Sequence, residues 1–215
     1  MLHDLGRYYF RRRYTILFYS LVFTMAASPI VAALGWRGAV IESLLAANLL
    51  AAAIPINAGK TRTFLLPAMA AVWLARVLAA WSGHSRLSEI MVAFWTLIGL
   101  FAAAAALRFA MRGARVEAEH LSAALSAYLL AGIYFGLLYW DLEQASPGLF
   151  NAVNFSRTDA IYFSFVTLAT LGYGDIVPRT DLARGLAIFE AVGGQLFLAV
   201  LVARLLSVYS NSARD

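Results

Sequence analysis

The sequence contains no cysteine and few charged residues. None of its 215 residues is a cysteine, so no disulfide framework can stabilise the fold. Charged residues make up 13% of the chain, whereas a soluble domain of this length carries roughly a quarter. Hydrophobic residues make up 62%, and the few charges cluster between long apolar runs. This composition excludes an ordinary soluble domain and indicates a chain that lies in lipid.

Long apolar runs fill most of the sequence. A helix that crosses the hydrocarbon layer needs about 20 mostly apolar residues, and six stretches are predicted to do so: 14–34, 39–58, 64–82, 87–110, 121–140 and 182–208. A seventh apolar stretch, 160–171, is too short to span and is typical of a re-entrant segment. Non-helical backbone at membrane depth is tolerated where it is buried in protein or lines a water-filled path. The sequence thus predicts an all-α membrane protein with six transmembrane helices and one re-entrant segment.

Basic residues are biased towards one side of the predicted membrane. With the N-terminus inside, eleven Lys and Arg residues fall in inside segments and five in outside segments. This bias predicts a multi-pass protein with both ends in the cytoplasm, and the compact chain suggests a bacterial or archaeal inner membrane. The first span follows basic residues but is too long for a cleaved signal core, so we expect a retained anchor. Because the arginines end apolar segments, the net charge of +5 reflects topology and not nucleic-acid binding.

One polar segment divides the chain into two parts. Residues 111–120 are predicted to be a cytoplasmic linker between a four-helix domain, 1–110, and a second domain, 121–210. The second domain holds a span, the half-span and a final span. We expect the half-span to begin as a helix, because Ser156 stands three residues before Asp159 in the capping-box spacing. That helix is predicted to end at Ala169.

Thr-Leu-Gly-Tyr-Gly-Asp, residues 170–175, follows the predicted half-span helix. Gly172 and Gly174 can adopt positive φ at little cost, which lets successive carbonyl groups point the same way. Four copies around an axis would stack rings of carbonyl oxygens that replace the water shell of a potassium ion. The expected K+ ligands are Thr170, Leu171, Gly172 and Tyr173, with Gly174 completing the filter. Tyr173 is expected to point away from the axis and pack against the half-span helix.

The segment 170–175 resembles the potassium-channel signature Thr-Val-Gly-Tyr-Gly-Asp, and the resemblance covers about residues 119–210. It implies a tetrameric potassium channel superfamily member with outer helix, pore helix, selectivity filter and inner helix in family order. The implied function is passive, potassium-selective conduction by a homotetramer surrounded by membrane lipids, with no cofactor besides the permeant K+. Six spans with one pore resemble the voltage-gated layout. However, the fourth span carries no charge between Ile90 and Leu107, so steep voltage dependence is not expected.

Departures from the signature leave a second function open. Leu171 replaces the usual Val or Ile, and Ala169 stands where many members have a second Thr. These changes permit an alternative reading as a weakly selective monovalent cation channel. Val166 falls where some members place a Glu that pairs with the Asp after the filter. Asp175 therefore needs another partner, for which we name Tyr162 of its own or of a neighbouring pore helix.

The final span contains candidates for gating and for the pore lining. Gly194 lies where the family's inner helix has its hinge glycine, although Gly193 and Gly194 could equally serve close helix packing. Glu190 is predicted to anchor the back of the pore helix near Thr167 or Ser164, in preference to binding ions. Helical spacing places three further residues on one cavity-lining face: Gln195, Leu198 and Val202.

The N-terminal spans contain a few charged residues. Arg76 lies about mid-span, where a lone cation is costly, so we expect an ion pair with Glu42 or, failing that, Glu89.

Other classes of protein fit the sequence less well. A potassium transporter carries four unequal pore loops in one chain, and this chain has one. The sequence holds no zinc-protease motif, no nucleophile elbow and no cluster of intramembrane carboxylates or histidines. We therefore predict that the protein is not an enzyme.

Overall fold

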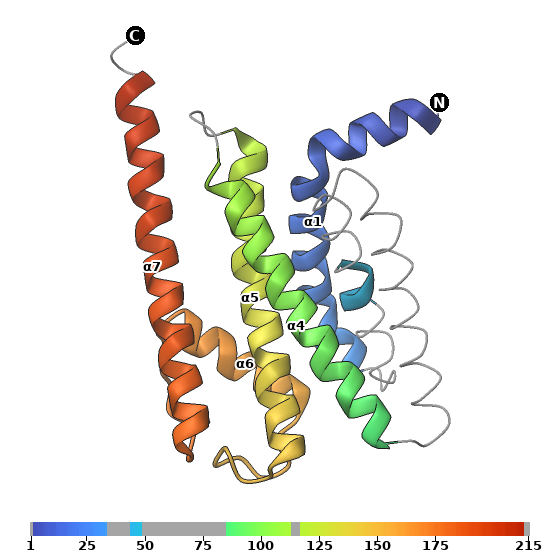
Figure 1. The fold of residues 1–215 in the computed structure, drawn as a ribbon, viewed down its shortest axis with the longest axis vertical. Coiled ribbons are helices and arrows are strands. Elements are labelled where there is room, and N and C mark those ends of the chain that lie inside the picture. Colours follow the sequence, from blue (N-terminus) through green and yellow to red (C-terminus); the bar gives the residue numbers. More distant parts are fainter. Residues whose placement is uncertain (1, 34–43, 49–84, 113–116, 213–215) are drawn as a thin grey trace. The chain divides into compact units, whose positions relative to one another are not determined.

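A computed structural model describes residues 2–33, 44–48, 85–112 and 117–212. Within these ranges the regular structure is helical, apart from one isolated bridge between Phe150 and Pro178. Figure 1 shows the five main helices: α1 (Leu2–Ala33), α4 (Ser85–Ala110), α5 (Ala118–Ala145), α6 (Arg157–Leu168) and α7 (Asp181–Ser212). The predicted all-α class therefore agrees with the described part of the chain.

The helices coincide with several of the predicted apolar stretches. Helices α4, α5 and α7 cover the stretches 87–110, 121–140 and 182–208, and α6 covers most of the half-span. Of the described residues, α5 and the part of α7 from Asp181 to Ser207 are long and apolar enough to cross a membrane. The predicted spans 39–58 and 64–82 fall outside the described residues, apart from helical residues 44–48. Six spans and the division at 111–120 stay predictions.

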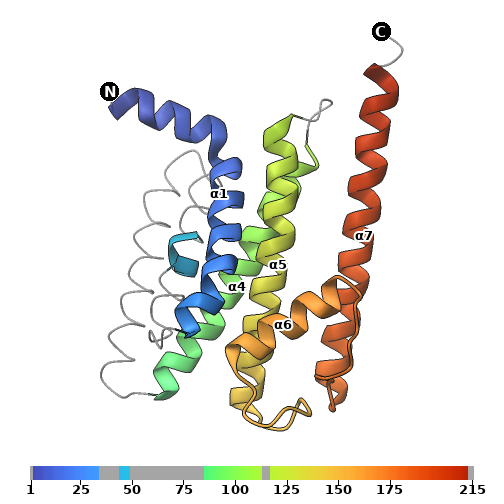
Figure 2. The ribbon, with the colours of Figure 1, turned by 180° about the vertical axis from the view of Figure 1, so that it is seen from behind.

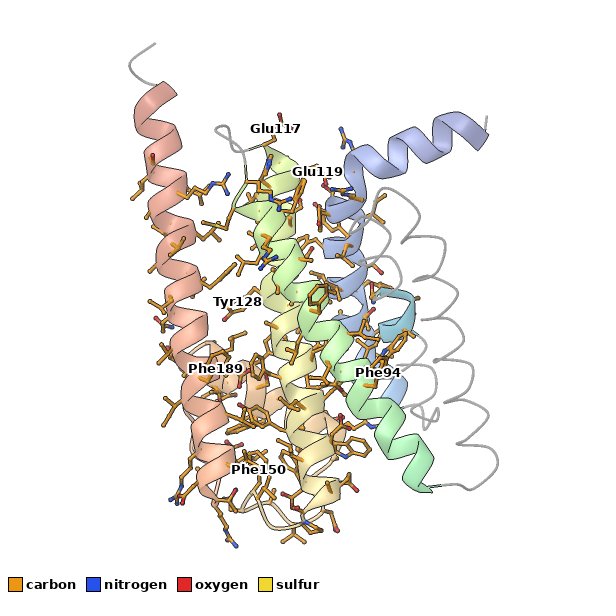
Figure 3. The ribbon with its side chains drawn as sticks, viewed as in Figure 1. Phe94, Glu117, Glu119, Tyr128, Phe150 and Phe189 are labelled. Atoms are coloured by element: carbon orange, nitrogen blue, oxygen red, sulfur yellow. The ribbon has the colours of Figure 1, made fainter. Side chains whose placement is uncertain are left out.

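The chain divides into two compact units, and the first comprises residues 1–91 and 101–129. Its helix α1 bends at Arg12, where φ is −125° and ψ is 23°, so the first turns leave the line of the rest of the helix (Figure 1). Alanines allow helix backbones to approach closely, and seven alanines of α4 and α5 are buried in this unit: Ala102, Ala103, Ala106, Ala110, Ala123, Ala124 and Ala127. Glu119, labelled in Figure 3, accepts hydrogen bonds from the backbone of Tyr14 and the hydroxyl of Thr15.

The second unit comprises residues 92–100 and 130–215 and contains the half-span. Helix α6 lies between α7 and the C-terminal part of α5 in both views (Figures 1 and 2). Two glycines of α5, Gly132 and Gly136, form a Gly-x-x-x-Gly pair against α6. A Cβ atom on Gly136 would lie 2.5 Å from Ile161 Cα, and one on Gly132 would lie 2.5 Å from the Phe165 ring. Glycine is therefore required at both positions for α6 to pack this closely.

An aromatic cluster fills the rest of the second unit's core. Phe150 lies in the loop after α5 (labelled in Figure 3) and stacks on Phe155 with ring centroids 4.5 Å apart. Tyr139 and Phe163 meet Phe150 edge-on. Such pairs add about 0.5–1.5 kcal/mol each beyond the burial of their area. The cluster holds the start of α6 and the loop before it in place.

Candidate functional site

The half-span helix α6 begins at a capping box. Ser156 has extended backbone angles, and its hydroxyl accepts from the amide of Asp159, whose carboxylate accepts from the amide of Ser156. Two of the four unpaired amides at the start of the helix are satisfied in this way. The predicted helix start is confirmed. The predicted end at Ala169 is one residue late, because α6 ends at Leu168 and Ala169 is its C-cap.

The end of α6 turns directly into the candidate filter through two capping hydrogen bonds. The amide of Leu171 donates to the carbonyl of Val166 at 2.9 Å, and the amide of Thr170 donates to that of Thr167 at 3.0 Å. This is the pattern of a Schellman cap, in which the residue after the C-cap adopts the left-handed conformation. Thr170 occupies that position with φ of 55°. The sequence predicts positive φ at the two glycines but not at Thr170.

Left-handed backbone recurs at every second residue of the candidate filter. Thr170, Gly172 and Gly174 have φ of 55°, 56° and 80°, whereas Leu171 and Tyr173 do not have positive φ. Alternation of this kind turns successive carbonyl groups towards one side of the strand, as a carbonyl-lined ion path needs. For a β-branched threonine this conformation is a genuine outlier that costs about 1–3 kcal/mol. Such strain persists where the surroundings impose it, and here the α6 cap does so.

Side chains from α6 support the outer end of the candidate filter. The Tyr162 hydroxyl donates to the Asp175 carboxylate at 2.9 Å, and this is the partner that the sequence analysis named. The Tyr173 ring lies parallel to the Tyr162 ring, with centroids 6.4 Å apart. Tyr173 therefore faces α6, while Val166 is buried within it.

The loop before α6 holds the backbone that leaves the candidate filter, through contacts that were not predicted from the sequence. The Asn151 side chain donates to the Asp175 carbonyl at 3.1 Å and accepts from the Val177 amide at 2.8 Å. The Glu143 carboxylate orders the same loop by accepting from three consecutive amides, at residues 148–150. An asparagine in a loop is too common a signal to identify such a clamp. The Gly-x-x-x-Gly pair on α5, by contrast, could have been recognised as a packing motif.

Helix α7 brings two of its predicted residues, Gly194 and Gln195, to the end of α6 and the start of the candidate filter. Gln195 Nε2 lies 3.5 Å from Thr170 Oγ1, and Leu198 and Val202 are exposed in the single chain. Gly194 is buried against α6, where a Cβ atom would lie 2.9 Å from the Leu168 carbonyl oxygen. Close packing therefore explains Gly194, whereas Gly193 meets nothing within 4 Å. The hinge role stays a prediction.

The predicted intramembrane charges have different outcomes. Glu190 is buried and contacts Ser164 of α6, one of the two neighbours expected, and its other oxygen accepts from Tyr139. The Thr167 carbonyl instead accepts the Thr170 amide in the α6 cap. The expected pair of Arg76 with Glu42 lies outside the described residues.

Comparisons with known proteins agree with this geometry. A family model described as "Ion channel" matches residues 124–211, which include α6, the candidate filter and nearly all of α7. The inward rectifier potassium channel Kirbac3.1 of Paramagnetospirillum magnetotacticum is 42% identical over 77 residues, which cover 34% of this chain and 24% of that protein. Two-pore potassium channel 4 of Arabidopsis thaliana is 49% identical over 61 residues, 26% of this chain and 22% of that protein.

A shorter relative is covered over most of its length. Protein LctB of Bacillus caldotenax is 32% identical over 104 residues, which cover 42% of this chain and 77% of that protein. The chain thus covers a quarter or less of the two potassium channels above and about three quarters of Protein LctB. No solved structure gives a significant match.

Proposed function

This chain belongs to the potassium channel superfamily, and we propose that it forms a homotetrameric pore that conducts K+ passively and selectively. The observation that carries the proposal is the alternation of positive φ at Thr170, Gly172 and Gly174 directly after a capped helix. Carbonyl groups on one side of an extended strand are what a dehydrated potassium ion requires. We assign the ion ligands to residues 170–173.

Four chains are needed because one candidate filter strand supplies one quarter of each carbonyl ring. The exposed apolar side chains of α7 support this assembly, since a stripe of this size normally lies against protein or lipid. They include Ile188, Phe189, Val192 and Leu196, each more than half exposed in the single chain. We propose that neighbouring chains and membrane lipid cover them. The protein is a membrane protein, and we infer a multi-pass topology in a prokaryotic inner membrane.

One polar and two apolar residues of α7 support a cavity below the filter. Gln195 reaches the Thr170 hydroxyl, so we infer that it lies at the cavity's upper end, with Leu198 and Val202 lining it further down. The C-terminal end of each pore helix would direct its negative dipole at this cavity and favour a cation there. We expect no enzymatic activity and no cofactor beyond the permeant ion.

Weakly selective monovalent cation conduction is the second candidate. Two departures from the family favour it. Leu171 stands where the signature has a β-branched residue, and Ala169 stands where many members have a second threonine. A bulkier, unbranched side chain behind the filter would hold its diameter less firmly. The two candidates predict different ratios of K+ to Na+ flux, but both require the same homotetrameric assembly.

Ion flux from liposomes that hold the purified full chain tests both candidates. We expect K+ flux to exceed Na+ flux greatly and to vanish in Gly174→Asp, because φ of 80° is strained for any residue with a side chain. Gly185→Ala is the matched control, since it lies on α7 with open space around it. Equal K+ and Na+ fluxes would favour the second candidate. Flux that survives Gly174→Asp would refute the assignment of the filter.

A further inference from the structure

A buried polar network joins three helices behind the pore helix. Tyr139 of α5, Ser164 of α6 and Glu190 of α7 are 0%, 0% and 1% exposed. The surrounding core is apolar and aromatic. Buried polar groups in such a place are costly unless each is hydrogen-bonded, so the arrangement of hydrogens within the network matters.

The network contains three oxygen–oxygen contacts, but its two hydroxyl groups supply only two hydrogens. The Tyr139 hydroxyl donates to Glu190 Oε2 at 2.8 Å. Ser164 Oγ lies 2.7 Å from the Gly132 carbonyl oxygen and also within hydrogen-bond distance of Glu190 Oε1. A serine hydroxyl has one hydrogen, and a carbonyl oxygen has none. If Ser164 donates to Gly132, only a proton on Glu190 can complete its contact with Ser164.

We propose that Glu190 is a positioning residue that carries a proton and donates it to Ser164. The resulting series of hydrogen bonds runs from Tyr139 to the Glu190 carboxylic acid, then to Ser164 and the Gly132 carbonyl. Each oxygen pair then shares one hydrogen, and no charge is buried in the apolar core. The series ties α6 to α5 and α7 together, and this reading rests on the proposed function of the filter.

The position of Ser164 explains why this link would matter for the filter. Ser164 lies directly before the three residues whose carbonyls cap the start of the filter, residues 165–167. Apolar packing holds a helix at a distance but has no preferred direction, whereas a hydrogen bond does. The network would therefore fix the rotation of α6 about its axis, and with it the direction of those carbonyls. Because Glu190 is enclosed, it acts through α6 and does not meet the permeant ion.

Three variants of the full chain in liposomes test the positioning role. Glu190→Gln keeps one donor for Ser164 and one acceptor for Tyr139, so the ratio of K+ to Na+ flux should stay within about twofold of wild type. Glu190→Leu has a similar size and no polar atom, so both hydrogen bonds of Glu190 are lost. The ratio should fall by about fivefold or more, because the loss of one buried hydrogen bond alone is worth about that factor. Tyr139→Phe, which removes one hydroxyl, should reduce the ratio less. A ratio unchanged in Glu190→Leu, or reduced as much in Glu190→Gln as in Glu190→Leu, would overturn the proposal.

An infrared spectrum tests the proton without any need for flux. Wild type should show the carbonyl-stretch band of a protonated carboxylic acid that Glu190→Gln lacks, and Ser164→Ala should shift that band. If the band of a protonated carboxylic acid is the same in wild type and Glu190→Gln, Glu190 carries no proton and the proposal is refuted. If Glu190→Leu fails to assemble, Tyr139→Phe and Ser164→Ala still decide the positioning role by their flux ratios. A wild type without selective flux would refute the proposed function, while the infrared band would still decide whether Glu190 is protonated.

Discussion

Adding one methyl group at Gly194 should disturb the contact between α7 and the end of the pore helix. The new Cβ atom would lie 2.8 Å from Leu168 Cδ1 and 2.9 Å from the Leu168 carbonyl oxygen. The leucine side chain can move aside, but the carbonyl belongs to the last residue of α6, next to the cap that starts the candidate filter. Gly194→Ala therefore forces a shift of backbone at the inner end of the filter.

The neighbouring glycine supplies the matched control. Overpacking a well-filled site costs about 1–3 kcal/mol, and replacing Gly by Ala in a helix returns about 1 kcal/mol. Gly194→Ala should thus destabilise each chain by about 0–2 kcal/mol. Gly193→Ala meets nothing within 4 Å and should stabilise it by up to about 1 kcal/mol. The structure predicts a difference of about 1–3 kcal/mol between two adjacent and chemically identical substitutions.

Thermal unfolding of the purified assembly, with ion flux measured in parallel, tests this difference. We expect Gly194→Ala to unfold at a lower temperature than Gly193→Ala and to lose part of its K+ selectivity. If Gly194→Ala unfolds at the same temperature as Gly193→Ala or above it, the packing argument is wrong. A hinge role would give a different result, in which Gly194→Ala lowers the flux and leaves the unfolding temperature and selectivity unchanged.

Three further substitutions test the supports around the filter. Asn151→Ala should free the Asp175 carbonyl, so the unfolding temperature should rise less than in wild type when the K+ concentration is increased. If it rises as much as in wild type, Asn151 does not support the filter. Tyr162→Phe keeps the ring and loses the hydrogen bond to Asp175, so K+ flux should decay faster during sustained conduction; a decay like that of wild type would show that this bond does not hold the outer mouth. Gly136→Ala places a methyl group 2.5 Å from Ile161 Cα and should reduce the yield of assembled protein sharply, and a normal yield would contradict the described packing of α6.

Much of the architecture could be predicted because it depends on local and periodic features. Apolar runs of about 20 residues specify helices wherever water is absent, since every backbone group must then be satisfied within its own segment. The capping box at Ser156 was predictable because its two partners lie three residues apart in the chain. The candidate filter was predictable for a similar reason, since Gly172 and Gly174 permit positive φ whatever surrounds them.

What the sequence by itself determined about this protein is therefore the helical class, the candidate filter and the start of the helix before it. The tertiary structure decided which side chains meet: Ser164 and not Thr167 faces Glu190, Asn151 reaches Asp175, and Gly194 packs on Leu168. It also decided the left-handed conformation of Thr170, which no intrinsic preference of threonine favours. The α6 cap imposes the conformation of Thr170, whereas the contacts between side chains share another physical reason. These contacts depend on how segments distant in sequence are placed against one another, and that placement is set by packing and buried hydrogen bonds together and not by any local pattern.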